Sequence, residues 1–166
     1  ITIPHGGRMM AIDWDRASNA KTPTDSAGFL LWQVYHLWHR RITRALKPLK
    51  LTHMQFVLLA CAGWLTRESP LLNQKQLSEF TGIDVMTVSQ VLRTLEKKGF
   101  IRRRPHPQDP RSHAISLHAS GTRILEQALP IVEASDAMVL ASGSRNVAEL
   151  LRCILEKNSE YNHLQK

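Results

Sequence analysis

The residues best suited to chemistry surround a proline-rich turn in RRRPHPQDPRSHAISL, at 102–117. Three arginines, 102–104, precede this turn, and Asp109 and Arg111 lie two positions apart within it. Guanidinium groups bind phosphate and carboxylate through paired hydrogen bonds. Asp109 would repel an anion, but it can grip the Arg111 guanidinium and fix its direction. The pattern predicts a stiff cationic contact for an acidic partner.

The charge of the chain is unevenly distributed. The 166 residues carry a formal net charge of +8, and residues 26–67 contain no Asp or Glu. Residues 97–111 hold six Lys or Arg against Asp109 alone, whereas acids outnumber bases from Ile124 onward. A basic middle part favours nucleic acid as the partner.

The sequence gives little indication of a membrane protein or a secreted protein. The apolar run FVLLACAGWL at 56–65 is about half the length of a spanning helix, and no stretch resembles a secretion signal. Cys61 and Cys153 are isolated, which suits a reducing compartment. We therefore expect no membrane association and a cytoplasmic protein. Apolar neighbours should raise the pKa of Cys61, which argues against a redox role.

Two short helices joined by a glycine turn must position the chemistry. Asn73 can cap a helix over 74–81, and Gly82 suits its left-handed end. Asp84 can cap a second helix over about 84–98, which Gly99 would close. This second helix has an apolar stripe on one face and no acid between Asp84 and Glu96 on the other. The pattern is typical of a helix-turn-helix with its recognition helix second.

The arginine-rich segment follows the second helix directly. FIRRRP and HAISLH alternate apolar and polar residues on either side of the proline turn, which predicts a β-hairpin over about 100–117. A hairpin after a recognition helix is the wing of a winged helix. We therefore predict a mainly α fold with a small β-hairpin wing, an α+β winged helix-turn-helix flanked by N- and C-terminal dimerisation helices.

The flanking segments divide the chain further. Apolar helical patterns over 25–50 and 119–166 exceed what a winged helix at 51–118 can cover, so we expect dimerisation helices there. An intramolecular bundle is the alternative. We interpret residues 1–24 as a leader segment, of which residues 1–8 are either flexible or not part of the native protein.

Catalytic and metal-binding chemistry is not indicated. The chain has no glycine-rich phosphate loop, no paired carboxylates in a likely cleft and no nucleophile motif, so we expect no enzyme activity and no cofactor. His36 and His39 are spaced i, i+3 but lack a further ligand, and we expect no metal site.

The stretch 76–121, QLSEFTGIDVMTVSQVLRTLEKKGFIRRRPHPQDPRSHAISLHASG, resembles the MarR family of bacterial transcription regulators. LEKKGFIRR between recognition helix and wing, DPRS at the wing tip and the L-x-x-x-G at 117–121 carry the resemblance most specifically. It implies a homodimeric repressor on a pseudo-palindromic operator, with recognition helices in major grooves and wings at minor grooves.

Matched position by position, the resemblance implies that Thr87 and Ser89 hold phosphates and that Gln90 and Arg93 face bases. Gln can pair with adenine and Arg with guanine in the major groove. Met86 and Gln90 stand where many members carry a small hydroxyl and a basic residue, which bears on operator sequence. The other expected DNA contacts come from the helix and wing: Thr94, Lys97, Arg102, Arg104, Asp109, Arg111 and Ser112. Arg103, like its two neighbours in the run, is expected to be a phosphate contact or a solvated strand charge rather than a base reader.

The resemblance also implies a small-molecule pocket between the dimer helices and the winged helix. Its expected lining is aromatic with a few polar atoms, which suits a small aromatic effector that releases the repressor. The expected lining residues are Trp32, Tyr35, His36, His39 and Trp64. Ordinary core or interface packing is the alternative role for each of them. The alternative function is a winged-helix protein-interaction or dimerisation module without specific DNA readout.

Overall fold

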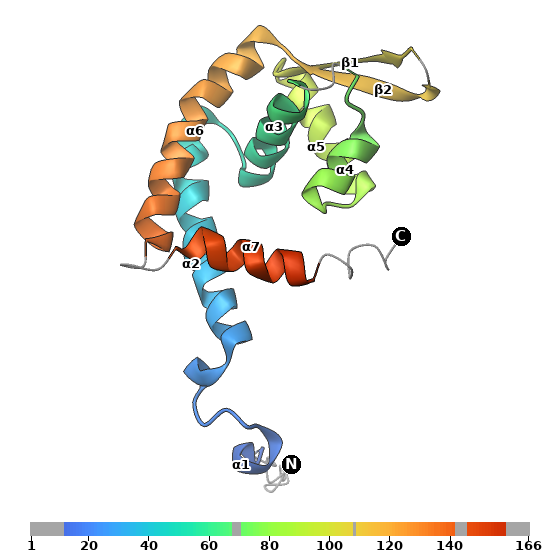
Figure 1. Cartoon of the computed structure of the whole chain (residues 1–166). Helices are drawn as coiled ribbons and strands as arrows, with labels where there is room; N and C mark the ends of the chain where they lie inside the picture. Colours follow the sequence, from blue (N-terminus) through green and yellow to red (C-terminus); the bar gives the residue numbers. More distant parts are fainter. Residues whose placement is uncertain (1–11, 68–70, 108, 142–145, 159–166) are drawn as a thin grey trace, which may run out of the picture. The chain divides into compact units, whose positions relative to one another are not determined.

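The computed structural model describes residues 12–67, 71–107, 109–141 and 146–158, so the expectation for residues 1–8 lies outside the described chain (Figure 1). The chain forms two compact units that divide inside helix α2 (Ala27–Leu46), between His36 and Leu37. The fold is mainly α with one two-stranded hairpin, which confirms the predicted fold class.

The first unit contains α1 (Trp14–Ala17), the 3-10 turn η1 (Pro23–Asp25) and the start of α2. Asp13 caps α1 by accepting a hydrogen bond from the Arg16 backbone N–H at 3.2 Å. None of the residues described in this unit is buried. Its part of α2 instead exposes a run of large apolar side chains: Phe29, Leu30, Leu31, Trp32, Val34 and Tyr35.

The second unit is built around α3 (His53–Leu65), which contacts α4 (Gln74–Thr81), α5 (Val85–Lys97), α6 (Ala119–Leu140) and strand β2 (Asp109–Leu117). Thr52 caps α3 by accepting a hydrogen bond from the Gln55 backbone N–H at 3.2 Å. Because α3 is apolar around most of its circumference, it has a neighbour on nearly every side.

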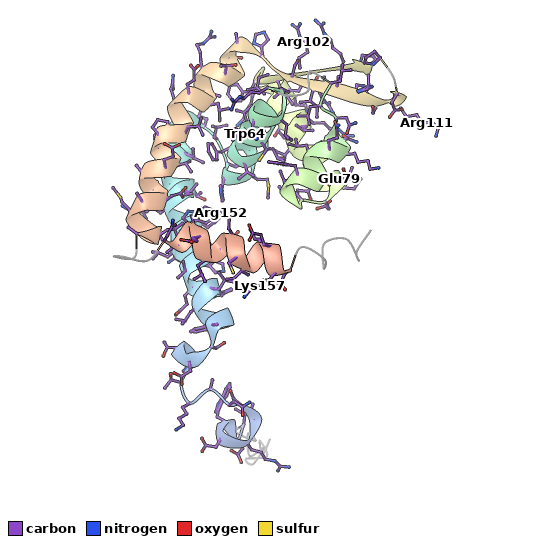
Figure 2. All side chains as sticks on the ribbon, in the orientation of Figure 1. Trp64, Glu79, Arg102, Arg111, Arg152 and Lys157 are labelled. Atoms are coloured by element: carbon purple, nitrogen blue, oxygen red, sulfur yellow. The ribbon has the colours of Figure 1, made fainter. Side chains whose placement is uncertain are left out.

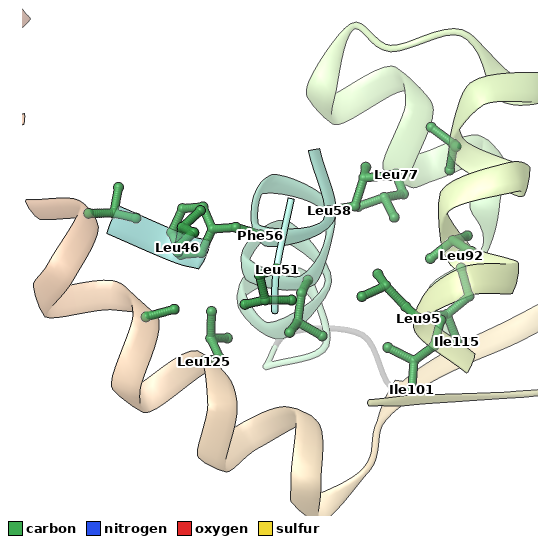
Figure 3. Close-up of a cluster of buried hydrophobic side chains, with 14 of the residues drawn as sticks. Leu46, Leu51, Phe56, Leu58, Leu77, Leu92, Leu95, Ile101, Ile115 and Leu125 are labelled. Atoms are coloured by element: carbon green, nitrogen blue, oxygen red, sulfur yellow. The ribbon is translucent and has the colours of Figure 1, made fainter. Parts of the chain in front are cut away.

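A single buried cluster holds this unit together (Figure 3). It draws on the end of α2, on α3, α4, α5, both strands and α6, so the helix-turn-helix and the hairpin share one core. Burying each large aliphatic side chain contributes about 1.5–3 kcal/mol relative to exposure. The members that Figure 3 labels are Leu46, Leu51, Phe56, Leu58, Leu77, Leu92, Leu95, Ile101, Ile115 and Leu125.

The hairpin pairs β1 (Ile101–His106) with β2 in antiparallel register, from Ile101 opposite Leu117 to Pro105 opposite His113. The register shifts between Pro105 and His106, where the turn begins. The chain before α4 joins the same sheet, because the Ile115 backbone N–H donates to the Leu72 carbonyl at 2.7 Å. The hairpin is thereby tied to the helix-turn-helix through its backbone.

The 3-10 turn η2 (Lys47–Leu49) links α2 to α3, and α7 (Val147–Lys157) follows α6. Asn146 caps α7 through the Glu149 backbone N–H at 3.2 Å. None of its residues is buried, and one side is strongly apolar. Across the described helices, none has the length and apolar character needed to cross a membrane.

Candidate nucleic-acid interface

The helix-turn-helix is set by three local signals that the sequence predicted. Asn73 and Gln76 form a reciprocal capping box at the start of α4. Gly82 ends α4 with φ of +69°, a left-handed conformation that a side chain would strain. Asp84 then caps α5 by accepting from the Thr87 backbone N–H at 2.9 Å. These caps and the turn are confirmed, and they fix where α5 begins.

The outer face of α5 presents polar and cationic side chains to solvent. Gln90, Arg93 and Lys97 are exposed, and Ser89 is half-buried. Hydrogen bonds from the half-buried Thr87 hold the pKa of the Asp84 carboxyl below its ordinary value. Asp84 therefore fixes the first turn of α5, while the exposed Gln90, Arg93 and Lys97 after it can meet a partner.

Thr94 is engaged within the fold. Its Oγ1 accepts a hydrogen bond from Gln55 Nε2 at 3.0 Å and donates to the Val91 carbonyl at 2.7 Å. Gln55 is buried, and its Oε1 accepts from Lys98 Nζ at 2.8 Å. Thr94 and Lys98 thus join α5 to α3. Sequence reasoning missed this network, because nothing in the periodicity of α3 distinguishes a buried glutamine from an exposed one.

Arg103 also has a structural role, which corrects its expected role as a phosphate contact or solvated strand charge. Its Nε and guanidinium Nη2 donate to Glu96 Oε2 at 2.8 and 2.6 Å, and its backbone N–H donates to Glu96 Oε1 at 3.1 Å. In the part of the chain that the structure describes, this is the one salt bridge. Strand alternation could have indicated that Arg103 faces the rest of the fold, since it lies on the same side of β1 as buried Ile101.

The Glu96–Arg103 pair locks the hairpin onto the end of the recognition helix. The turn between them is a Schellman motif: Gly99, at φ of +71°, donates to the Glu96 carbonyl, and Phe100 donates to the Leu95 carbonyl. Hydrogen bonds from Arg103 hold the pKa of Glu96 below its ordinary value of 4.5. The hairpin and α5 therefore form one surface with a fixed angle.

Replacing Glu96 with Gln should lower the free energy of unfolding at pH 7 by about 1 kcal/mol, because a charge-assisted pair at a partly exposed site is worth little more. Since the pKa of Glu96 is depressed by folding, its contribution is complete above pH 4.5 and is lost as the pH falls through the lower folded-state value. The stability gap between wild type and Glu96→Gln, measured by urea unfolding, should close over that range.

Glu126 on α6 supplies the matched control, because it is exposed. Glu126→Gln should follow the wild-type pH profile throughout. A Glu96→Gln gap that stays constant from pH 7 to pH 3 would show that the ion pair does not couple to stability.

The remaining wing cations point outward. Arg102, Arg104 and Arg111 are exposed, and Figure 2 shows Arg111 at the outer end of the hairpin and Arg102 at the end next to α6. Arg102 and Arg104 alternate with Arg103 along β1, so they face away from the core. These three guanidiniums form the cationic edge of the wing.

At the wing tip, Asp109 contacts the backbone of Arg111 and not its guanidinium, so the predicted side-chain pairing is wrong. Asp109 Oδ1 accepts from the backbone N–H of Arg111 at 3.0 Å, and Ser112 Oγ donates to the Asp109 carbonyl at 3.3 Å. An aspartate side chain that accepts a hydrogen bond from the backbone N–H two residues later forms an Asx turn. Asp109 therefore fixes the backbone from which Arg111 extends, and the guanidinium remains available.

The residues expected to line an effector pocket fall in both units. In the first unit, the rings of Trp32 and Tyr35 lie 4.3 and 5.4 Å from that of His36. In the second, the rings of His39 and His53 are 5.2 Å apart. Trp64 lies near the opposite end of α3 from His53, about 16 Å along the helix axis, and its ring carries the Arg67 guanidinium at 4.7 Å. Trp64 therefore does not join the His39 group.

A hollow of about 430 Å³ lies between α2 and α6 in the second unit. Leu37, Ala45, Ala134 and Met138 give it apolar walls, and three arginines of α2 border it. None of the five predicted pocket residues lines it.

Burial raises the pKa of the Cys61 thiol, as predicted, which leaves little reactive thiolate.

Comparison with known proteins decides the family. The MarR family profile matches residues 51–113, which span α3 through most of the hairpin. Over 74% of this chain and 84% of the relative, the sequence is 43% identical to YdcH, an HTH-type transcriptional regulator of Bacillus subtilis. The chain belongs to the MarR family. It is also 31% identical to the HTH-type transcriptional repressor Rv2887 of Mycobacterium tuberculosis, over 78% of this chain and 91% of that one.

Solved MarR-family structures share the fold. CouR from Rhodococcus jostii RHA1, solved with p-coumaroyl-CoA bound, superimposes with a TM-score of 0.71 at 23% identity, over 82% of this chain and 94% of CouR. This MarR-family chain is thus a winged helix-turn-helix transcription regulator in sequence and in fold.

Proposed function

We propose that this MarR-family chain acts as a homodimeric repressor that binds a pseudo-palindromic operator. The observation that carries the proposal is the single rigid surface formed by α5 and the wing. The Glu96–Arg103 pair and the shared core hold the two elements together. The outer face of α5, which has no acid between Asp84 and Glu96, continues into the exposed arginines of the wing.

The arrangement assigns different work to the two elements. Gln90 and Arg93 on α5 have the hydrogen-bonding groups to read adenine and guanine in the major groove. Thr87, Ser89 and Lys97 border them and suit phosphates, which position a protein without specifying sequence. Arg111 extends from the wing tip into the adjoining minor groove, where an arginine responds to narrow width and negative potential. Arg102, Arg104 and Ser112 contribute phosphate contacts.

Exposed apolar surface supports the dimer. No residue of α7 is fully buried within the protomer, although Leu150, Leu151, Ile154 and Leu155 all lie on one side of the helix. The start of α2 is also apolar and exposed. A second copy that covers these surfaces would place two recognition helices in successive major grooves, with half-site centres about 10 base pairs apart.

The direct test is selection of duplexes by the full-length chain from a randomised pool. The expected result is enrichment of an inverted repeat with half-sites about one helical turn apart. An enriched pool without any common sequence would contradict operator recognition and favour a winged helix used for protein interaction.

Arg111→Ala should weaken binding to the enriched duplex by about 1 kcal/mol or more, and should reduce the slope of log affinity against log salt by about one unit. The reason is the loss of one guanidinium that displaces a counterion from DNA. Fluorescence anisotropy at several salt concentrations measures both quantities. Arg152→Ala on α7 is the control and should leave the salt slope unchanged. An unaltered affinity and slope in Arg111→Ala would remove the wing tip from the interface.

A second proposal concerns release by a small aromatic ligand. CouR binds p-coumaroyl-CoA, and the clustered rings of Trp32, Tyr35 and His36, with His39 nearby in sequence, suit an aromatic ligand here. A ligand can release DNA only if it prefers one dimer spacing to another. Titration with p-coumaroyl-CoA should quench tryptophan fluorescence and lower operator affinity together, and no change in either would count against this ligand class.

We assign no catalytic role and no cofactor to the chain, and we place its action in the cytoplasm, where its DNA target would lie.

A further inference from the structure

Met86 lies in the first turn of α5 and is 71% exposed. It stands apart from the buried stripe of the helix, which consists of Val88, Leu92 and Leu95. A large exposed side chain on a helix whose apolar stripe is already covered gains nothing from folding. Its side chain is therefore available to contact a partner.

The row to which Met86 belongs shows which partner it meets. Gln90, Arg93 and Lys97 follow Met86 at i+4, i+7 and i+11, so the four side chains lie along one side of α5 over about 16 Å. The three polar members are exposed, and no acid interrupts the row. A protein partner that buried Met86 would also bury Arg93, and it would have to supply a carboxylate of its own to pair with that guanidinium.

A DNA major groove offers contacts for both the polar and the apolar members of the row. It supplies phosphates for the cations and base edges for Gln90 and Arg93. The N-terminal residues of a recognition helix are the ones that reach base edges, and Met86 is in the first turn.

The chemistry of Met86 narrows its target. A thioether is at most a weak hydrogen-bond acceptor, so Met86 cannot read the polar groups of the bases. Thymine alone presents an apolar group in the major groove, its C5-methyl. An unbranched, flexible side chain can adapt its length to reach that methyl.

Building on the proposed operator function, we propose that Met86 packs against the C5-methyl of a thymine in each half-site, beside the base that Gln90 reads. Met86 then contributes to operator specificity by favouring thymine at that position.

Replacing thymine by uracil removes only the methyl group and so tests the contact directly. The probe is the duplex that the wild-type chain enriches from a randomised pool, synthesised with uracil at each thymine in turn. At one thymine per half-site, uracil should lower wild-type affinity about fourfold, as expected for one buried methyl. Met86→Ala should bind thymine and uracil duplexes equally at that position.

Two further variants separate this contact from other effects. Met86→Leu keeps an apolar side chain and should retain a uracil penalty. Arg93→Ala should bind more weakly overall and keep the full penalty. Because Met86 is exposed, Met86→Ala should unfold at the wild-type temperature.

Equal uracil penalties for wild type and Met86→Ala at every thymine would overturn the assignment of Met86 and leave operator binding intact. Failure of the wild-type chain to enrich any sequence would overturn operator binding, and the Met86 contact with it.

Discussion

Gly121→Ala should destabilise the second unit by about 3 kcal/mol or more and lower the melting temperature by roughly 10 °C. Gly121 is buried in the first turn of α6, and a Cβ atom there would lie 1.9 Å from the Phe100 carbonyl oxygen and 2.8 Å from its carbonyl carbon. Both are backbone atoms, so no side chain can rotate out of the way. Thermal unfolding followed by circular dichroism measures the effect.

The backbone around Phe100 has little freedom to move. The Phe100 carbonyl accepts from the His118 backbone N–H at 2.9 Å, its own N–H closes the Schellman turn, and the neighbouring Gly99 carbonyl accepts from Ser120 Oγ. A shift of Phe100 would therefore disturb the junction of α5, β1 and α6 together. Operator binding should weaken along with stability, since this junction sets the angle of the wing.

Gly28→Ala is the matched control. A Cβ atom at Gly28, on α2, meets nothing closer than Ser26 Oγ at 3.9 Å, and alanine is the better helix former. The melting temperature should stay the same or rise slightly. A Gly121→Ala protein that unfolds at the wild-type temperature would mean that α6 does not approach Phe100 as closely as described.

The paired change Leu150→Asp with Ile154→Asp should convert the dimer to a monomer and weaken operator binding by about 100-fold or more. The two side chains are 61% and 49% exposed and lie one turn apart on the apolar side of α7. Charges buried in an interface are costly without partners, and loss of the second recognition helix removes the gain from linking two half-sites. Light scattering after size exclusion and anisotropy with the enriched duplex give the two readouts.

Arg152→Asp changes the net charge by the same two units on the polar side of α7 and should remain dimeric. Dimers in both variants would place the interface elsewhere. A monomeric Leu150→Asp/Ile154→Asp protein that retains full operator affinity would instead contradict the need for two chains.

Local rules were enough to predict the elements that carry the site. Asn73, Gly82, Asp84 and Gly99 each act through their own backbone or the next few residues, so their roles follow from residue type and spacing. The hairpin followed likewise from its alternation.

The details that sequence reasoning missed depend on contacts between elements. Arg103 pairs with Glu96, and Thr94 with the buried Gln55, because tertiary packing brings those atoms together. The Asp109 carboxylate was expected to accept hydrogen bonds from the Arg111 guanidinium. It accepts one from the backbone N–H of Arg111 instead, because that donor is closer along the chain. Trp64 and His39 are both aromatic, but the length of α3 keeps them apart.

The most direct test of the central claim, that α5 and the wing form one sequence-reading surface displayed twice by a dimer, is a comparison of two affinities at one salt concentration. The full-length chain is titrated against the duplex it enriches and against a shuffled duplex of the same length and composition. We predict two chains bound per enriched duplex, with an affinity at least about 1,000-fold higher than for the shuffled one. Equal affinities for the two duplexes would contradict the account.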